Sequence, residues 1–497
     1  MATPMNTTTA PSTAGEAHEL EKSQPINEVE TIPLSTTEDR KLLRRIDLWL
    51  CPLMFFTMTL QYMDKQALPT ASILGIIQDL NLSGRQYSWA SSIFWFGYLG
   101  FTYATPYLMV RLPIGKLLSC TFVGWAVIIG CHAALKNFGG LMAVRALLGM
   151  AEAAAIPGFS LLIGMFYKRQ EHALRHGYWF IGNSLGIIIN GLVAFGVAHI
   201  RSGIGAWKWL FVTLAIITFV WATAMFWLLP DTPVTAKFLS PEQRVHAVER
   251  LRSNQTVVKN RHFQWYQFRE ALVDPRIWLI VLFLIAVSIC SSAIAAFTPI
   301  VIVGLGYDVF QANLFNLALG GIHGGFGIAA TYLCSRYENI RCITCAALCT
   351  VSLVGALLVQ FGPNIGSKLF GILIFWAYPC TVAIAFSLVA SNVAGFTKKS
   401  VATSMATLGY CAGNMIGPFL FFPREKPKYQ SGFTATACCF GIAIVIMLSL
   451  LVLTRYENSR RDRVFGVVDE STLERVEEEV SMNDRTDGEN SVFRYMM

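Results

Sequence analysis

The stretch RALLGMAEAAAIPG, residues 145–158, lies inside a long apolar run and yet contains the charged residues Arg145 and Glu152. A charge near the centre of a bilayer costs about 3 kcal/mol or more, so charges retained there usually face a partner or a water-filled space. Seven residues separate the two, which places them on one helix face but about 10 Å apart along the axis. This separation is too large for an ordinary i,i+4 pair, so each charge needs a partner from another helix or a polar cavity.

The rest of the chain has the composition of an integral membrane protein. Of its 497 residues, 54% are hydrophobic and 14% are charged, and the mean hydropathy is +0.49; a water-soluble chain of this size is less apolar. Runs of about 20 apolar residues, each long enough to cross a hydrocarbon core of about 30 Å as a helix, recur along the sequence. We predict an all-α membrane protein with twelve transmembrane helices at residues 47–70, 86–110, 114–135, 139–166, 174–198, 208–230, 275–303, 312–334, 341–361, 367–390, 399–422 and 432–454.

A polar segment separates the sixth span from the seventh and divides the chain into two halves. Two six-helix halves with a binding site at their interface form the architecture of many secondary transporters. Within the central segment, SPEQ at 240–243 is a capping box with proline at the first helical position, which predicts a short helix on the cytoplasmic surface. Both tails are polar and poor in aromatic residues, which is typical of disorder. The predicted parts are a disordered cytoplasmic tail at 1–45, an N-terminal half at 46–230, a cytoplasmic central loop at 231–274, a C-terminal half at 275–455 and a cytoplasmic tail at 456–497.

The net charge of +8 is spread over alternate loops and is not gathered in a patch that would suit nucleic acid. By the positive-inside rule, the basic loops and both termini are cytoplasmic. The residues concerned are Lys41, Arg44, Arg45, Arg111, Lys116, Lys168, Arg169, Arg175, Arg336, Arg341, Lys398, Lys399, Arg455, Arg460 and Arg461. One loop disagrees, because Arg424, Lys426 and Lys428 lie between the last two spans, where the chain should be outside. We expect a monomer in the lipid bilayer of the plasma membrane, with no nucleic-acid partner.

No cofactor or metal is expected. The 12 cysteines lie mostly inside apolar segments, without paired spacing in outer loops, which argues against a disulfide framework. Cys342, Cys345 and Cys349 share a helical face, but a metal site would need a fourth ligand. The sequence shows no pairing of a nucleophile with a base, so we expect that the protein is not an enzyme and that a proton gradient drives its activity.

The first span supplies candidate partners for the charges of residues 145–158, because QYMDKQALPTA contains Asp64 and Lys65. We hypothesise that Lys65 and Arg145 bind an anionic substrate, Arg145 through its bidentate fork and Lys65 as a point charge. Glu152, nearer the midplane, would take up and release a proton, because removal from water disfavours a charged carboxylate. Asp64 would hold Lys65 or Arg145 while the site is empty. The alternative is that these four residues form structural ion pairs between helices.

Other polar residues in the predicted spans are weaker candidates for substrate contact. They are Asn183 and Asn190 in the fifth span, Asn316 and His323 in the eighth, Tyr378 in the tenth and Asn414 in the eleventh. Asn183 and Asn190 share a helix face, and interhelical hydrogen bonding explains them about equally well. His323 could titrate near neutral pH, although a lone histidine among glycines more often packs or forms a hydrogen bond. Gly182 and Gly186 form a small-xxx-small strip that permits close helix approach.

Several motifs resemble, in order, those of one transporter family. The motifs are YMDKQALPTA, RALLGMAEAAAIPG, YKRQEHALRHGYWF, LLPDTPVTAKFLSPEQR, FTPIVIVGLGYDVFQANL, NVAGFTKKS and GNMIGPFLF, and the resemblance as a whole runs from about residue 40 to 455. They resemble the anion:cation symporter branch of the major facilitator superfamily, and more closely its fungal allantoate permease family. In related organic-anion transporters, a basic residue in the first span and the Arg and Glu of the fourth serve substrate and proton. The resemblance carries these roles to Lys65, Arg145 and Glu152.

The resemblance implies proton-coupled import of a small organic anion by alternating access. The family's substrates include allantoate, vitamins and carboxylates, and nothing in the sequence selects among them. Lys65 stands where the family often has arginine, so the bidentate geometry of that position is absent. The alternatives are export of a fungal secondary metabolite and a non-transporting nutrient sensor.

Overall fold

The computed structural model describes residues 36–168, 171–200, 203–250, 263–337, 339–426, 428–466, 484–491 and 493–497. Most of the expected N-terminal tail, residues 1–35, lies outside this described part, as do residues 251–262 of the central loop and 467–483 of the C-terminal tail. The described residues form helices and turns and no β-strand.

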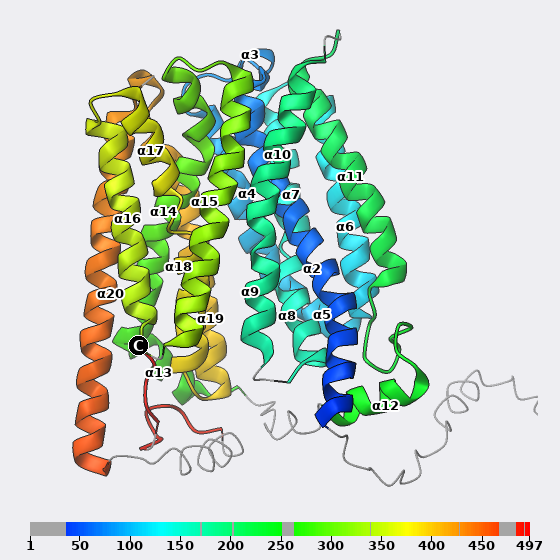
Figure 1. The fold of residues 1–497 in the computed structure, drawn as a ribbon, viewed down its shortest axis with the longest axis vertical. Coiled ribbons are helices and arrows are strands. Elements are labelled where there is room, and N and C mark those ends of the chain that lie inside the picture. The colour runs from blue at the N-terminus through cyan, green and yellow to red at the C-terminus, as the bar shows by residue number, and fades with distance from the viewer. Residues whose placement is uncertain are drawn as a thin grey trace, which may run out of the picture.

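Two helical bundles stand side by side, with both described ends of the chain at the same end of the molecule, which we call the termini end (Figure 1). The N-terminal bundle consists of α2 (Thr36–Ile73), α3 (Ile76–Asp79), α4 (Gln86–Thr102), α5 (Ala104–Arg111), α6 (Ile114–Cys131), α7 (Phe138–Glu152), α8 (Ala155–Phe166), α9 (His172–Phe180), α10 (Gly182–Ala198) and α11 (Ala206–Leu228). The C-terminal bundle consists of α14 (Pro275–Gly304), α15 (Val309–Arg336), α16 (Arg341–Phe361), α17 (Ile365–Phe375), α18 (Cys380–Asn392), α19 (Phe396–Ile416) and α20 (Gln430–Phe465). Between the bundles, α10 packs along α15, α2 along α14 and α4 along α19.

The helices are long and apolar enough for a multi-pass membrane protein. Among the described residues, 9 helices or helix pairs satisfy both length and hydropathy requirements for a span. The first, second and eleventh expected spans correspond to α2, to α4 with α5, and to α19, which run alongside the others in Figure 1. Counted with them, the architecture is consistent with the twelve predicted crossings.

Proline explains two places where a span is broken into two helices. A proline ring clashes with the carbonyl four residues earlier and offers no N–H to it. Pro157 therefore disfavours continuous helix at Ala153, and α7 ends beside it at Glu152. In the same way, Pro379 disfavours continuous helix at Phe375, four residues earlier, and Phe375 is the last residue of α17. The first of these breaks places Glu152 at a helix end in the middle of a span.

Glycines bring the helices that carry charge into close contact. A Cβ on Gly149 of α7 would overlap the backbone carbonyl of Phe94 in α4, and one on Gly97 would overlap that of Ala146. The predicted strip on α10 is confirmed, because Cβ atoms on Gly182 and Gly186 would lie 2.6 Å from the carbonyl oxygens of Phe55 and Thr59 in α2. These approaches fix the positions of α2, α4 and α7 around the charges.

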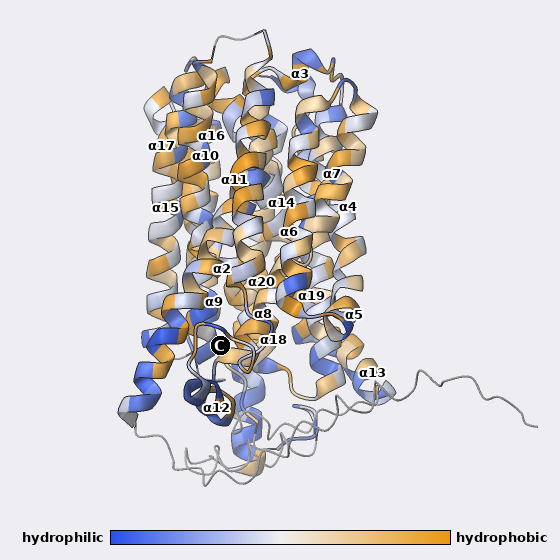
Figure 2. Cartoon of the chain, turned by 90° about the vertical axis from the view of Figure 1, so that its right-hand side faces the viewer, coloured by the Kyte–Doolittle hydropathy of each residue, from blue (hydrophilic) through white to orange (hydrophobic). Residues whose placement is uncertain are grey.

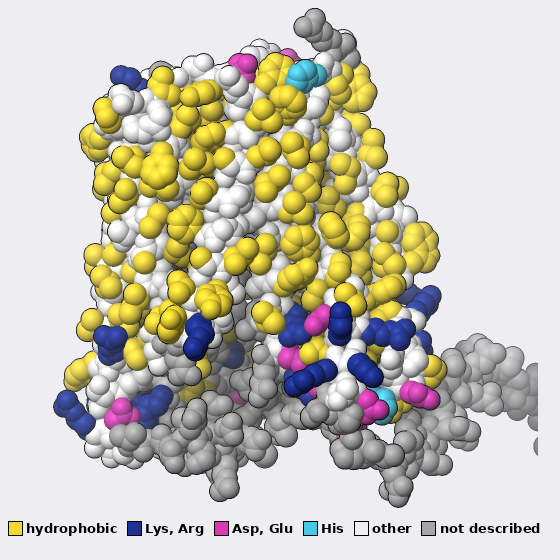
Figure 3. Space-filling view, viewed as in Figure 1, with side chains coloured by type: hydrophobic (Ala, Val, Ile, Leu, Met, Phe, Trp, Pro, Cys, Tyr) yellow, Lys and Arg dark blue, Asp and Glu magenta, His cyan; other side chains and the backbone are white. Residues whose placement is uncertain are grey.

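The surface is apolar around the middle of the bundle and polar at its ends. Figure 2 shows hydrophobic residues along the helices and hydrophilic ones concentrated at the termini end. On the face drawn in Figure 3, Lys and Arg gather at that same end, below a broad apolar band. Because the helices alternate in direction, the described residues of the predicted cytoplasmic loops lie at the termini end.

Part of the connecting segment packs against the N-terminal bundle. Ser240 and Gln243 form the predicted capping box, with reciprocal hydrogen bonds of 3.2 and 3.3 Å, at the start of α12 (Pro241–Arg250). At the other end of this helix, the buried Arg250 pairs with Asp39 of α2 at 2.6 Å and with Glu171. Asp39 is helical because α2 begins at Thr36, earlier than the boundary expected at residue 45.

Replacing Gly149 by alanine is expected to destabilise the protein by about 1–3 kcal/mol, because the added methyl group meets the backbone of α4 and requires the helices to separate. The measurement is the unfolding temperature of the purified protein in detergent.

Gly164 of α8 provides the matched control, since a Cβ there has nothing within 4 Å. Gly164→Ala should leave the unfolding temperature unchanged or raise it slightly, because alanine favours helix. Equal unfolding temperatures for the two variants would contradict the close approach of α4 and α7.

Candidate functional site

The charged residues of α2 and α7 meet in the interior of the bundle. The Nζ atom of Lys65 lies 3.9 Å from Oε2 of Glu152, and its side chain is 21% exposed whereas that of Glu152 is fully buried. Gln61, one turn before Lys65, donates from Nε2 to the backbone carbonyl of Glu152 at 3.3 Å. Neither carboxylate oxygen of Glu152 has a hydrogen-bond partner among the described residues. The long ion pair thus leaves the carboxylate with unused acceptor capacity.

Arg145 is buried without a matching carboxylate. Its side chain is enclosed by α4, where Nε donates to the carbonyl of Ala90 at 3.4 Å and the guanidinium lies 5.5 Å from the ring centre of Phe94. It forms no ion pair among the described residues, and one terminal nitrogen has no hydrogen-bond partner there. A buried guanidinium with free donors is a suitable site for an anion.

Asp64 occupies a different position from the one expected. Neither of its carboxylate oxygens has a hydrogen bond in the described part of the chain, and Lys65 pairs with Glu152 and not with Asp64. Asp64 is still close enough to interact electrostatically with Glu152, Arg145 and Lys65. The expected role of holding Lys65 or Arg145 through an ion pair is therefore absent in this state.

Contacts between the halves close the end of the bundle opposite the termini. Near that end, the Tyr87 hydroxyl donates to the carbonyl of Ala296 at 2.7 Å, and Ser92 donates to that of Met415 at 2.8 Å. Trp89 of α4 stacks edge-on against Phe419, with ring centres 5.0 Å apart. These bonds join α4 to α14 and α19 and seal this side in the present conformation.

The candidates on α10 and α15 lie at the interface between the halves. His323 is buried, and its Nδ1 lies 2.7 Å from the hydroxyl of Ser184. Asn190 donates to Thr70 of α2 at 2.8 Å, which favours the interhelical reading of that residue. The carbonyl oxygen of the buried Asn183 has no partner among the described residues. Asn316 is partly exposed and faces Gly191 across the interface.

The two remaining candidates are engaged within the C-terminal half. Tyr378 is buried, with its ring 5.6 Å from that of Phe440 in α20 and 6.0 Å from that of Phe375. Asn414 donates to the carbonyl of Tyr410 one turn earlier in α19 at 2.8 Å. Both are therefore packing residues in this conformation and not part of the charged cluster.

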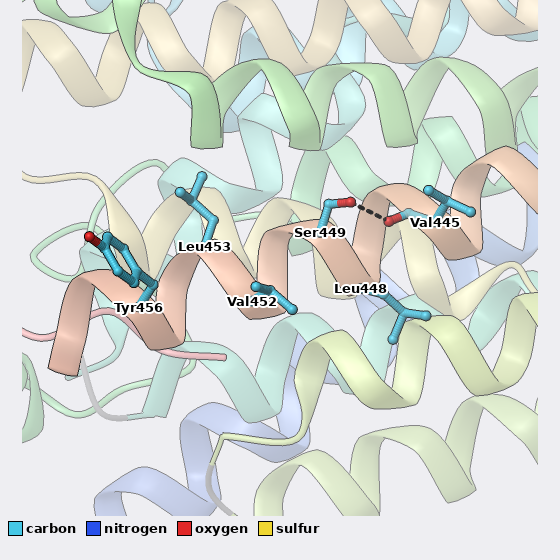
Figure 4. Close-up of a pocket in the computed structure, with 6 residues that line it drawn as sticks. All are labelled: Val445, Leu448, Ser449, Val452, Leu453 and Tyr456. Carbon is cyan, nitrogen blue, oxygen red and sulfur yellow. Dashed lines mark hydrogen bonds between the residues drawn. The ribbon is translucent and has the colours of Figure 1, made fainter. Parts of the chain in front are cut away.

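The outer face of α20 has a groove of about 530 Å³, but this groove lacks the features of a polar-substrate site. It is lined along one side of a single helix by Val445, Leu448, Ser449, Val452, Leu453 and Tyr456 (Figure 4). The hydroxyl of Ser449 donates to the carbonyl of Val445 within the helix at 2.8 Å. In a bilayer this apolar surface faces lipid.

The described residues contain no group of three or more His, Cys, Asp or Glu side chains placed to hold a metal ion. Cys342, Cys345 and Cys349 are buried and not disulfide-bonded.

Sequence comparison identifies the family. The profile of the Major Facilitator Superfamily matches residues 54–418. The chain belongs to the major facilitator superfamily. An allantoate permease of Saccharomyces cerevisiae is 32% identical over 487 residues, which cover 95% of this chain and 89% of the permease. An uncharacterized transporter of Schizosaccharomyces pombe is 33% identical over 461 residues, covering 92% and 90% of the two chains.

A solved structure shares the architecture of this major facilitator. It is a bacterial homolog of the human lysosomal transporter Spinster, with a TM-score of 0.61 and 11% identity, covering 82% of this chain and 97% of that one. At this identity the match shows the fold alone. Together with the sequence relatives, it confirms the predicted fold class and family, and the protein is a multi-pass transporter and not an enzyme.

The structure of this major facilitator adds an aromatic wall that the sequence did not indicate. Lys65 lies 5.8 Å from the ring centre of Trp95, and Trp95 meets Tyr410 of the other half edge-on at 5.4 Å. Trp95 and Tyr410 are partly exposed. Every predicted span contains at least one aromatic residue, so only tertiary contacts distinguish those beside the charges. Gln61, by contrast, was detectable as a polar residue one turn before Lys65.

Replacing Tyr87 by phenylalanine should favour opening at the end opposite the termini. The change removes one hydrogen bond of about 1 kcal/mol between the halves, a shift of about fivefold in the opening equilibrium. The measurement is the distance distribution between spin labels at Ser83 and Lys428, two exposed residues at that end.

Labelling requires that the exposed cysteines Cys120, Cys131 and Cys438 first be replaced by serine. Tyr178→Phe, at an exposed tyrosine of α9, is the control and should not change the distribution. An identical distribution for Tyr87→Phe would show that this bond does not hold the halves together.

Proposed function

We propose that the protein is a proton-coupled symporter that imports a small organic anion across the plasma membrane by alternating access. The observation that carries this proposal is the presence of two basic groups, the partly exposed Lys65 and the buried Arg145, near the buried carboxylate of Glu152. Lys65 forms an ion pair with Glu152 at 3.9 Å, whereas Arg145 has a terminal nitrogen without a hydrogen-bond partner and no carboxylate partner among the described residues.

Competition for Lys65 would couple the proton to the substrate. While Glu152 is ionised, its charge holds the Lys65 ammonium, and a substrate anion must displace it. A proton on Glu152 removes this competitor and leaves Lys65 and Arg145 free to bind the anion. Anion and proton are then favoured together, which is the thermodynamic requirement for symport.

The charge balance supports the same order of events. With all four groups ionised, Lys65 and Arg145 balance Asp64 and Glu152, and the site is neutral. Adding an anion alone would leave a net negative charge in a low-dielectric interior, which is costly. One proton on Glu152 restores neutrality. The loaded site is then electrically neutral when it changes from facing one side of the membrane to facing the other.

The aromatic wall supports a substrate with a planar part beside its negative charge. Trp95 and Tyr410 are partly exposed next to Lys65, and aromatic faces pack well against planar groups. One relative of this chain carries the name allantoate permease, and allantoate is a small organic acid. We propose the same class of small organic acids for this chain.

The orientation follows from charge. The basic loops gather at the termini end, and the positive-inside rule would place that end in the cytoplasm. In the present conformation the opposite, extracellular end is then the sealed one. Partial exposure of Lys65 in this state fits release of a substrate toward the cytoplasm.

Uptake of a panel of labelled organic acids, including allantoate, nicotinate and pantothenate, tests the proposal in yeast that lacks its own allantoate-type permeases. We expect uptake of one acid to rise at acidic pH and to collapse with a protonophore. No uptake by a protein verified at the cell surface, together with efflux from preloaded cells, would contradict import.

Glu152→Gln is expected to reduce proton-driven accumulation about tenfold or more, because the amide cannot carry the proton. Exchange of labelled for unlabelled substrate should persist, since the amide also releases Lys65. Glu242→Gln, at an exposed carboxylate of α12, is the matched control and should transport normally. Proton-driven accumulation that survives in Glu152→Gln would exclude the proposed proton site.

Lys65→Met should weaken substrate binding about tenfold or more while Glu152 and Arg145 remain in place, because it removes one of the two positive charges. The measurement is the concentration of substrate at half-maximal exchange. An unchanged value would assign Lys65 a purely structural ion pair with Glu152.

A further inference from the structure

The last described residues of the chain form a compact segment on the termini end of the C-terminal bundle. This C-terminal segment, residues 484–491 and 493–497, was expected to be part of a disordered tail. It follows α20, which itself continues to Phe465 and so beyond the expected boundary at residue 455. In Figure 1 the segment lies under α16, α18 and α19, beside α13 (Trp265–Val273).

Asp487 is the centre of this contact. It is fully buried. Its Oδ1 atom lies 2.7 Å from Nζ of Lys398 in α19, and its Oδ2 atom lies 3.2 Å from the guanidinium of Arg276 in α14. The same carboxylate accepts hydrogen bonds from the backbone N–H of Ala394 and the hydroxyl of Tyr495. A buried carboxylate with two cations and two further donors is fully compensated.

Arg461 of α20 recognises the backbone of the segment. Its guanidinium donates to the carbonyl oxygens of Asp487, Asn490 and Phe493 at 2.9 to 3.1 Å. It also donates to the Tyr495 hydroxyl at 2.9 Å. The Tyr495 ring lies under a second guanidinium, that of Arg276, at 3.7 Å. Arg461 is buried, and its two terminal nitrogens find these partners in the segment, while its Nε donates to Glu457 of α20 at 3.2 Å.

Two asparagines pair with the segment as a neighbouring β-strand would. Asn392 at the end of α18 donates to the carbonyl of Met496 at 2.8 Å and accepts from the N–H of Met496 at 2.7 Å. Asn458 of α20 does the same with Tyr495, at 2.8 and 2.9 Å. Such reciprocal bonds hold an extended peptide by its backbone.

The cations beneath the segment also contact carboxylates of their own bundle, and Lys398 pairs with Glu270 of α13 at 2.9 Å. Asp274, the N-cap of α14, lies 3.2 Å from Lys398 and 2.8 Å from Arg276. Burial raises the pKa of the Asp274 carboxyl, but the hydrogen bond from Arg276 and the charges of Arg276 and Lys398 lower it more, so its pKa lies below its usual value. Asp274 is therefore ionised at neutral pH. Of the three carboxylates around Lys398 and Arg276, Asp487 is the most deeply buried, and it is the only one of the three that the segment supplies.

We propose that the termini end of the C-terminal bundle is a peptide-binding site whose ligand is the C-terminal segment of this chain, and that the bound segment latches α14, α18, α19 and α20 together. The site takes an extended peptide with an aspartate that enters the Lys398–Arg276 pocket and a tyrosine eight residues later between two guanidinium groups. The latch joins the helix ends that must move as one body when the bundles rock against each other. It does not depend on which compound is transported.

The first experiment uses hydrogen exchange on the full-length protein in detergent. Backbone amides of Ala394, Tyr495 and Met496, which are bonded in the latch, should exchange at least about tenfold more slowly than in Asp487→Asn. Ser491→Ala, at an exposed residue of the same segment, should retain the slow exchange. Exchange of Tyr495 and Met496 at the rate of a free peptide in the unaltered protein would overturn the proposal.

The second experiment supplies the segment in trans. A chain that ends at residue 483 should unfold at a lower temperature than the full chain, and a fluorescent peptide of residues 484–497 should bind it and restore the lost stability. The Asp487→Asn peptide should bind about tenfold or more weakly and the Ser491→Ala peptide equally well. Equal binding of the Asp487→Asn and unaltered peptides, or a latch-free chain as stable as the full one, would refute the site.

Discussion

Charge in a low-dielectric interior needs compensation, and the ion pair between Lys65 and Glu152 shows how incomplete that compensation is here. The pair is long at 3.9 Å, and the carboxylate oxygens have no hydrogen-bond partner among the described residues. A structural ion pair would be short and supported by further hydrogen bonds, because desolvation otherwise exceeds the attraction. The geometry instead suits a pair that separates during a transport cycle.

The packing around the charges follows from this requirement. Gly97 and Gly149 allow α4 and α7 to touch along their backbones, and Gly182 and Gly186 do the same for α10 and α2. Helices at such distances exclude lipid and leave the polar groups facing one another. Pro157 ends α7 at Glu152, so the carboxylate lies where the helix is broken and can respond to movement of either part.

A different solution operates at the termini end, where the charges are compensated almost completely. Asp487 forms ion pairs with Lys398 and Arg276 at 2.7 and 3.2 Å, and Arg461 donates hydrogen bonds to backbone carbonyls. At the other bundle, Arg250 links α12 to Asp39 and Glu171 in a similar way. These two networks hold helix ends together. The central cluster of Lys65, Arg145 and Glu152 differs from them, because it retains hydrogen-bonding groups that a ligand could use.

The sequence by itself determined the class of the protein. Apolar runs of membrane length predicted the spans, the polar segment at 231–274 predicted two halves, and Ser240 and Gln243 predicted the start of α12. Charges inside apolar runs are rare because they are costly, so Lys65, Arg145 and Glu152 could be recognised without a structure. Hydropathy and spacing act locally, and these features depend only on local sequence.

Tertiary structure decided which of these residues meet. Lys65 was expected to pair with Asp64 or to bind substrate, but it pairs with Glu152, and the oxygens of Asp64 have no hydrogen-bond partner among the described residues. Asn414 and Tyr378 proved to be engaged within their own half, and Trp95 of α4, a helix that packs along α7 and α19, lies beside Lys65. The C-terminal segment looked disordered because it is polar and short of aromatic residues. It is ordered because Lys398, Arg276 and Arg461, distant in sequence, converge on Asp487 and Tyr495, and only the fold brings those groups together.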